Sequence, residues 1–527
     1  MPKPHPIPDP NTPRATEAHR HKLEKFRESL TQLVFSTQGG TFAAKAYAHF
    51  LDGLLASLID SQTSVYPEQT ALVAVGGYGR QTLAPYADID VLFLSESSDQ
   101  DALNHWANHV LYPLWDLGIP IDHAVRSVQE TLELAEEDIR TATTLFDLRH
   151  LLGDKQLVTR LYTQGRAQLY ARKTAFIDTL EADVSTRQER FGGSLYLLEP
   201  EVKLGRGGLR DYDTAFWTVR VHWQVDSFQE LVDQNVLLAR EVQELEQSYE
   251  FLWRVRNTLH LRAGRRQDRL TFADQEEIAL ALGYTDHINL AVEQFMQHYY
   301  QHAQVVAYTT DRLLSRARLR STSHTHPETL SSGIVVSDDH VGIQGSDALW
   351  NTPALALELY VEAVKRELPP AIEARDAIAR VARDPVWTKR LREQSRATEA
   401  FLALLSYAGM APVRRGSVLG ELLEVGLMLA MVPEFDHVRG RVQHDIYHVY
   451  TVDVHSVASV DRLSAMVRGE HAGAWPLASR LAAESPRPLP LRLALLLHDI
   501  GKGRGGHHAE IGADMANAIA LRLGFSK

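Results

Sequence analysis

The sequence predicts an α+β protein that is mostly helical, with one small mixed β-sheet near its N-terminus. Short apolar, β-branched runs between residues 71 and 125 alternate with helical segments. Apolar residues at helical spacing dominate most of the chain after them. The length of 527 residues exceeds what a single core ordinarily holds, so we expect roughly three or four domains.

Composition is that of a folded protein, with 44% apolar and 23% charged residues. No apolar run approaches the roughly 20 residues that cross a bilayer, and the start is proline-rich, so we expect a cytoplasmic protein with no membrane partner. The net charge of −12 argues against a general nucleic-acid binder. Because the chain contains no cysteine, any metal must be held by His, Asp and Glu.

The first third of the chain combines helical and strand patterns. Apolar spacing, as at Leu23, Phe26 and Leu30, predicts two N-terminal helices, and β-branched runs predict a small mixed sheet. In chain order the expected elements are helices at 16–35 and 41–59, strands at 71–75 and 89–94, a helix at 102–117, a strand at 119–125 and helical structure from 132 to about 190.

The remaining sequence is predicted to be helical apart from three segments. Glycines and arginines between 191 and 211 indicate an ordered loop, small polar residues at 321–333 a linker, and two apolar runs at 334–336 and 341–343 a short hairpin. The helices expected around these segments lie at 212–220, 236–261, 288–316 and 354–366, with further helices beyond.

Two aspartates follow a glycine turn in the stretch VAVGGYGRQTLAPYADIDVLFLS, residues 73–95. Asp88 and Asp90 are two residues apart, so both carboxylates should leave the same side of a strand, where they could hold a divalent metal. A bare pair of this kind is most often a solvated strand end. Here the glycines of the turn let a backbone come close to a phosphate, which favours a metal and nucleotide site; they are Gly76, Gly77 and Gly79.

Further candidates for this site are a carboxylate and several cations. Asp122, on the third expected strand, is a candidate third carboxylate or an ordinary surface residue. Arg80 could meet a phosphate or pair with a nearby carboxylate. Lys203 and Arg210 in the glycine-rich loop, with the arginines at 254–269, could bind a triphosphate, steer a protein substrate, or form a solvated face.

Histidines gather near the C-terminus in a pattern that suggests a second metal site. His498 and Asp499 end an apolar helical run, and His455 lies on an upstream helix. Imidazoles and carboxylates from several helices are the donors that a cysteine-free hydrolytic metal site would use. The other histidines of the group are His444, His448, His507 and His508.

The motif GGYGR followed by PYADIDVLFL resembles the nucleotidyltransferase signature of the DNA polymerase beta superfamily. More narrowly, it is similar to bifunctional uridylyltransferase/uridylyl-removing enzymes, which modify the nitrogen-regulatory PII protein. Residues 112–128, 198–211 and 251–270 fit that family as well. The family usually has Gly where Asp122 stands and Asn where Glu201 stands.

The C-terminal histidines resemble the HD phosphohydrolase superfamily in the version found in the same enzymes. The resemblance implies that His455 is the first metal ligand and that His498 and Asp499 form the ligand doublet. It further implies that His508 serves a second metal, and Lys502 could contact phosphate. HD domains normally need a further aspartate, and the family continues into two glutamine-sensing ACT domains. Asp514 lies too close to the doublet to be this aspartate, and no ACT domain occurs before Lys527, so we expect an incomplete HD domain, weak UMP removal and no glutamine response.

The resemblance implies UMP transfer from UTP to a tyrosine of PII with Mg²⁺ or Mn²⁺, opposed by an HD domain that removes UMP. The alternatives are an RNA-directed nucleotidyltransferase of the tRNA-end-adding type and a non-catalytic nucleotide-binding regulator; the acidic charge disfavours the first. The expected domains are N-terminal helices (1–60), a nucleotidyltransferase core (61–150), a helical domain (151–320), a linker and hairpin (321–345) and an HD-like domain (346–527).

Overall fold

A computed structural model describes residues 12–526, except 36–38, 61–66, 192, 194, 288–289, 319–327, 331–332, 338–339, 346, 409–416, 442–450 and 505–506. The chain divides into two compact units. The first comprises Met1–Leu195, Glu199–Leu282 and Gln301–Arg318, and the second comprises Tyr196–Leu198, Gly283–Tyr300 and Leu319–Lys527.

A mixed four-stranded sheet lies at the centre of the N-terminal part of the first unit. Its strand order is β3-β2-β1-β4, where β1 pairs antiparallel with both β2 and β4, and β2 pairs parallel with β3. The strands are β1 (Thr70–Ala74), β2 (Ile89–Ser95), β3 (Ile121–Arg126) and β4 (Arg149–Gly153). The three strands predicted before residue 126 are confirmed.

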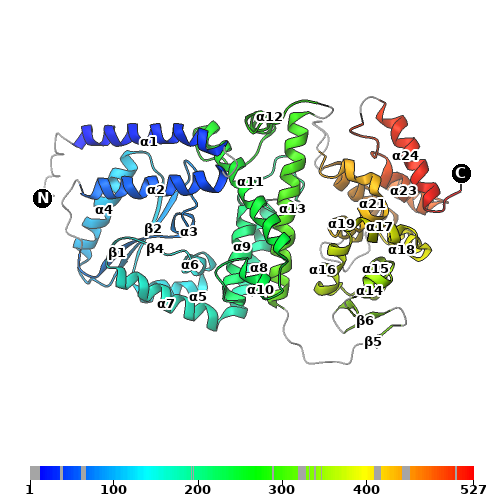
Figure 1. Cartoon of the computed structure of the whole chain (residues 1–527), viewed down its shortest axis with the longest axis horizontal. Helices are drawn as coiled ribbons and strands as arrows, with labels where there is room; N and C mark the ends of the chain where they lie inside the picture. Colours follow the sequence, from blue (N-terminus) through cyan, green and yellow to red (C-terminus); the bar gives the residue numbers. More distant parts are fainter. Residues whose placement is uncertain are drawn as a thin grey trace. The chain divides into compact units, whose positions relative to one another are not determined.

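Helices cover both faces of this sheet, which lies between α2 and α7 in Figure 1. Leu92 and Leu94 of β2 pack with residues of α5 and α7 in one buried apolar cluster, while Phe93, which points the other way, contacts Trp106 of α4 edge to face. The covering helices are α1 (Thr12–Val34), α2 (Gly39–Asp60), α4 (Gln100–Asp116), α5 (Val128–Glu137), α6 (Ile139–Thr144) and α7 (Lys155–Ala171). Both predicted N-terminal helices are confirmed.

Strand β4 corrects the prediction that residues 132–190 are helical throughout. Its five residues, RHLLG, begin with two basic side chains and show no apolar–polar alternation, so the sequence carries no local strand signal. The segment becomes a strand because it pairs with the second edge of β1, with a register shift between Leu72 and Val73. The pairing is long-range and invisible to local periodicity.

The rest of the first unit is helical, as predicted. Residues 195–208 form turns and bends, in agreement with the predicted ordered loop, whose last three residues instead begin α9. The helices are α3 (Gly76–Gly79), α8 (Lys173–Arg190), α9 (Leu209–His222), α10 (Glu230–Asp233), α11 (Ala239–Ala263) and α12 (Phe272–Ala281), followed by α13 (Ala291–Arg318), which runs through both units.

The second unit is helical apart from a small antiparallel sheet. The predicted hairpin of β6 (Ile334–Val336) and β7 (Val341–Ile343) is confirmed, and β5 (Glu328–Thr329), inside the predicted linker, adds a third strand. The other elements are α14 (Ala348–Asn351), α15 (Leu355–Arg366), α16 (Ile372–Val381), α17 (Pro385–Arg392), α18 (Ser395–Ser406), α19 (Val418–Glu424), α20 (Leu427–Met431), the 3-10 helix η1 (Pro433–Val438), α21 (Val452–Val467), α22 (Pro476–Ala483), α23 (Pro488–Leu497) and α24 (His508–Arg522).

The fold class predicted from the sequence, α+β and mostly helical with a small mixed sheet, is confirmed. Within the described part of the chain, no helix is both long enough and apolar enough to cross a membrane.

Candidate functional site

The sheet brings Asp90 and Asp122 directly opposite each other. They are register partners in the parallel ladder between β2 and β3, and Asp88 precedes β2 by one residue, on the same side as Asp90. Burial raises the pKa of Asp90 to about 6, and the nearby charges of Asp122 and Asp88 push it in the same direction. Negative charge is therefore concentrated at this end of the sheet.

The oxygen donors of Asp88, Asp90 and Asp122 fit a divalent cation, whose charge would offset the burial and the repulsion that together raise the pKa of Asp90. In the described part of the chain, these three carboxylates do not form a ready-made ligand group, since no set of three ligand oxygens, one from each, lies within 4.8 Å of one another. Asp88 instead forms an ion pair with Arg266, from the loop that follows α11.

The glycine turn holds the backbone of α3 against this carboxylate cluster. Gly76 has a φ of +56°, and a Cβ at this position would lie 3.0 Å from Oδ2 of Asp90. At Gly77 a Cβ would lie 3.0 Å from the carbonyl oxygen of Thr82, and at Gly79 only 1.7 Å from that of Asp147. The turn thus needs glycine for the close approach of backbone to its surroundings.

A hydrogen-bond network that the sequence did not indicate holds the glycine turn in place. The hydroxyl of Tyr78 donates to Asp52 of α2 at 2.7 Å, and Arg149 of β4 donates to the same carboxylate at 2.8 Å. Arg149 also donates to the backbone oxygen of Tyr78 at 3.0 Å. The turn is therefore tied to α2 and β4 together.

Arg80, the residue after the turn, pairs with carboxylates, which was one of the two expectations for it. Its guanidinium contacts Asp147 and lies 2.9 Å from Asp213 of α9. Burial lowers the pKa of Arg80, but the two carboxylates outweigh burial and raise it overall. Arg80 connects the turn to α9, the helix that the basic loop precedes.

Lys203 and Arg210 are the cations that act most strongly on Asp90, and both lower its pKa. Neither forms an ion pair with a residue in the described part of the chain. Burial, reinforced by Arg256 and Arg210, lowers the pKa of Lys203 to about 8. Burial also lowers the pKa of Arg210, whose Cζ lies 5.3 Å from the ring centroid of Trp217. These two cations are available to an anionic ligand.

The loop that carries Lys203 is fixed by hydrogen bonds. The carboxylate of Glu201 accepts from the backbone N–H of Gly205 at 3.0 Å, and that of Asp211 accepts from Gly207 at 2.7 Å. The N–H of Val202 donates to the carbonyl of Asp268 at 2.8 Å, which joins this loop to the loop after α11. Lys203 and Arg266 therefore project from adjoining segments.

The second unit gathers three of the predicted metal ligands. His455 of α21, and His498 and Asp499 at the end of α23, each offer a ligand atom, and these atoms all lie within 4.8 Å of one another. Two imidazoles and a carboxylate fit a divalent transition metal or Mg²⁺. Asp499 is held in its charged form because His498 and Lys502, whose Nζ lies 2.8 Å away, outweigh burial and lower its pKa.

Other C-terminal histidines occupy different positions. His508 begins α24, is exposed and does not belong to the group of three ligands. His444 and His448 lie outside the described residues. His437 of η1, which the sequence did not single out, donates from Nε2 to the carbonyl of Ile500 at 2.6 Å and so holds the turn after the doublet.

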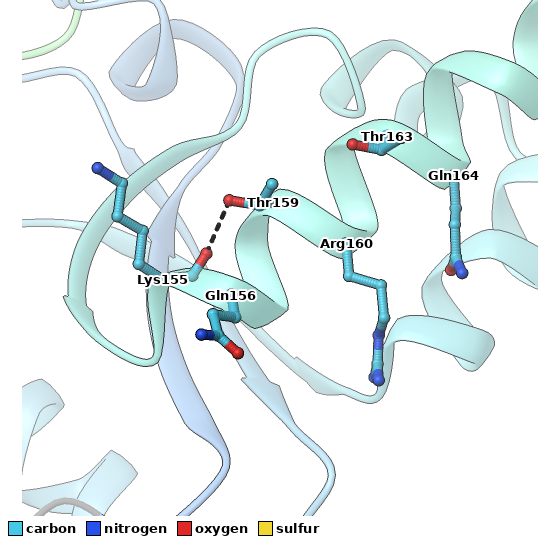
Figure 2. Close-up of a pocket in the computed structure, with 6 residues that line it drawn as sticks. All are labelled: Lys155, Gln156, Thr159, Arg160, Thr163 and Gln164. Carbon is cyan, nitrogen blue, oxygen red and sulfur yellow. Dashed lines mark hydrogen bonds between the residues drawn. The ribbon is translucent and has the colours of Figure 1, made fainter.

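A surface depression of about 540 Å³ runs along α7 (Figure 2), away from any residue predicted for a site. The Thr159 hydroxyl donates to its own helix at Lys155, 3.0 Å away, and Arg160 pairs with Glu96. Two of its polar side chains, Thr159 and Arg160, therefore already have partners. The depression is lined by Lys155, Gln156, Thr159, Arg160, Thr163 and Gln164.

Comparison with protein families assigns two segments. Residues 154–314 match the family described as GlnD PII-uridylyltransferase, and residues 468–526 match the family described as HD domain. The first match contains Lys203, Arg210 and Arg266, and the second contains His498 and Asp499.

Curated relatives extend the similarity over most of the chain. A bifunctional uridylyltransferase/uridylyl-removing enzyme of Azotobacter vinelandii is 35% identical over 481 residues, which cover 90% of this chain and 53% of the relative. Enzymes of the same name from Pseudomonas aeruginosa PAO1 (35% over 456 residues; 85% and 50%) and Azospirillum brasilense (32% over 515 residues; 93% and 54%) are also similar. The chain spans about half the length of these relatives.

Proposed function

We propose that this chain, which carries a GlnD PII-uridylyltransferase domain and an HD domain, transfers UMP from UTP to a tyrosine of PII. The HD domain would hydrolyse the product and remove UMP. The cofactor of transfer would be Mg²⁺ or Mn²⁺, the partners would be UTP and PII, and the reactions would take place in the cytoplasm.

The observation that carries this proposal is that Asp90 lies opposite Asp122 across β2 and β3, near Lys203 and Arg210, two cations that form no ion pair with any residue the structure describes. Carboxylates suit the metal and the cations suit the triphosphate, so one end of one sheet offers both halves of a metal–nucleotide site. The similar enzymes of Azotobacter vinelandii and Pseudomonas aeruginosa are uridylyltransferases by name, which supports UMP as the transferred group.

In the transfer step, the tyrosine hydroxyl of the acceptor attacks the α-phosphorus, and pyrophosphate leaves. A divalent metal held by Asp88 and Asp90 would supply charge neutralisation at the phosphates. Lys203 and Arg210 bind phosphate oxygens and stabilise the departing pyrophosphate. Asp122 is the exposed carboxylate of the cluster, so it is the one that can reach the acceptor and take the hydroxyl proton.

In the removal step, water attacks the phosphodiester between UMP and tyrosine. A divalent metal held by His455, His498 and Asp499 would supply an activated water at this position. Lys502, which lies beside Asp499, binds a phosphate oxygen of the substrate. Tyrosine leaves with a proton, and UMP is released.

Incubation of the chain with PII, tRNA, Mg²⁺ and each labelled nucleoside triphosphate in turn tests donor, acceptor and activity together. We expect label on PII from UTP in preference to the other nucleotides. The double variant Asp88→Ala/Asp90→Ala should abolish it, because the metal loses two ligands. Label on tRNA instead of PII would favour the tRNA-end-adding alternative, and unchanged labelling of PII by the double variant would refute this site.

A matched control keeps the double variant interpretable. Asp101 is an exposed carboxylate in the first turn of α4 and contributes no charge to the pKa shift of Asp90. Asp101→Ala should therefore retain UMP transfer within about twofold of the parent chain, since surface substitutions of this kind change stability little.

A further inference from the structure

Arg266 forms an ion pair with Asp88, one of the proposed metal ligands. Its Nη1 forms an ion pair with Oδ2 of Asp88, although the two residues are 178 positions apart in the sequence. The side chain of Arg266 is 47% exposed and that of Asp88 is 31% exposed, so solvent and ligands can reach this pair. A divalent cation bound to this carboxylate would compete with Arg266, because two positive charges so close together repel each other.

The second carboxylate near Arg266 does not require it. Nε of Arg266 lies 3.6 Å from Asp268, but Asp268 already accepts from Arg256 at 2.7 Å and lies 3.1 Å from Nε2 of His260. Leaving Asp88 would therefore not deprive Asp268 of its charged partner. The contact with Asp88 is the closer of the two that Arg266 makes.

The backbone of the Arg266 loop is held, so only the side chain has to move. Besides the hydrogen bond from Val202 to Asp268, the N–H of Leu270 donates to the carbonyl of Pro200 at 2.9 Å. These bonds fix the loop beside the segment that leads to Lys203. A guanidinium released from Asp88 thus stays next to the cations proposed to bind the triphosphate, and it suits phosphate oxygens.

The balance of charge at the site determines whether the guanidinium of Arg266 lies at Asp88 or at the proposed triphosphate site. Without ligands, Asp88, Asp90 and Asp122 face the cations Lys203, Arg210 and Arg266. A divalent cation alone would have to displace Arg266 into a region already rich in positive charge. A nucleoside triphosphate brings negative charge that accepts the displaced guanidinium.

We propose that Arg266 pairs with Asp88 in the absence of ligands. When a metal ion binds Asp88, the guanidinium of Arg266 leaves it and binds the phosphates of UTP, so that metal and nucleotide bind cooperatively. The inference rests on the proposed transferase site and specifies how that site is filled. Cooperativity of this kind is reciprocal: the factor by which UTP tightens metal binding equals the factor by which metal tightens UTP binding.

The test measures Mn²⁺ binding to the full chain. The electron paramagnetic resonance signal of free Mn²⁺ reports how much of the metal remains unbound. All variants carry His455→Gln and His498→Gln, so that the histidine site does not contribute. Titrations are made with and without a UTP analogue whose α,β-bridging oxygen is replaced by methylene. Arg266→Gln is compared with Arg265→Gln, the exposed neighbour whose guanidinium hydrogen-bonds to Arg266 and Gln267.

We expect Arg266→Gln to bind Mn²⁺ roughly threefold to tenfold more tightly in the absence of nucleotide, because the competing cation is gone. The factor by which the analogue tightens Mn²⁺ binding should shrink, whereas Arg265→Gln should match the parent chain in both. Equal Mn²⁺ affinity and equal coupling in Arg266→Gln and the parent would overturn the inference.

Asp88→Asn separates the two possible failures. If Asp88→Asn weakens Mn²⁺ binding but Arg266→Gln has no effect, the transferase site stands and the role of Arg266 is refuted. If Asp88→Asn leaves Mn²⁺ binding unchanged, the site and the inference are both refuted. Circular dichroism and the melting temperature of each variant show that it is folded, and we expect both to be unchanged for Arg266→Gln, since this side chain is half exposed.

Discussion

At the scale of single residues, Lys203 shows how burial prepares a side chain for an anionic ligand. Its neighbours Arg256, Arg210 and Arg266 are all positive, and together with burial they lower its pKa to about 8. A lysine in this situation gains a proton more readily once a triphosphate is bound, because the ligand adds negative charge beside it.

The affinity for UTP should therefore depend on pH above about 8. Below this value Lys203 is charged before binding; above it, binding must also recruit a proton, so affinity falls as pH rises towards the higher pKa of the bound state. Isothermal titration with UTP between pH 7 and about 9.5 measures this fall. Lys203→Arg, which stays charged throughout, should flatten the profile. A parent profile as flat as that of Lys203→Arg would contradict the role of Lys203.

Sequence reasoning identified Asp88, Asp90 and Asp122 as candidates but could not decide which partner each would meet. The spacing of Asp88 and Asp90 follows from strand geometry and is local, whereas the register that sets Asp122 opposite Asp90 depends on how β2 and β3 pair. The pair between Asp88 and Arg266 depends on the docking of a loop that is distant in sequence. No local pattern encodes such a contact.

At the scale of elements, the glycine turn is the part of the site whose shape the sequence restricts most. A Cβ at Gly79 would overlap the backbone oxygen of Asp147, and backbone cannot rotate away as a side chain can. Gly53, in α2, is a matched contrast, because nothing lies within 4 Å of its added Cβ.

Gly79→Ala should destabilise the protein by about 3 kcal/mol through overpacking, and it should also reduce UMP transfer. Gly53→Ala should instead stabilise the protein by up to about 1 kcal/mol, since alanine is favoured over glycine inside a helix. Urea unfolding followed by circular dichroism measures both changes. Equal stability of the two variants would show that the turn is not packed as described.

Secondary-structure elements differ in whether the local sequence alone predicts them. Long amphipathic helices such as α11 and α13 follow from apolar periodicity alone, and so do β1 and β2 from their β-branched residues. Strand β4 does not, because it takes its conformation from β1. Arg149, which supports the glycine turn, lies on β4 and was missed with it.

At the scale of the whole molecule, the chain carries two separate groups of candidate metal ligands with different donors. The carboxylates at the sheet belong to the first unit, and His455, His498 and Asp499 belong to the second. Oxygen donors favour Mg²⁺ or Mn²⁺, while imidazoles also accept softer transition metals. Each group can therefore be removed by substitution and examined by itself.

His498→Gln should abolish metal binding at the histidine group, because it removes one of three ligands. Metal content after dialysis, measured by mass spectrometry, should fall by one ion per chain relative to the parent. His508→Gln should cause a smaller loss, since His508 lies outside the group of three. An equal loss in both variants would contradict this grouping and show that His508 also holds this metal.

The central claim, UMP transfer at Asp90, is tested most directly by mass spectrometry of PII after incubation with UTP, Mg²⁺ and this chain. The account predicts one added UMP on a tyrosine of PII with the parent chain. With Asp90→Asn it predicts a rate at least about a hundredfold lower, because the metal that would stabilise the negative charge of the transition state loses a carboxylate ligand. PII that gains no UMP from the parent chain, or gains it as fast from Asp90→Asn, would contradict the account.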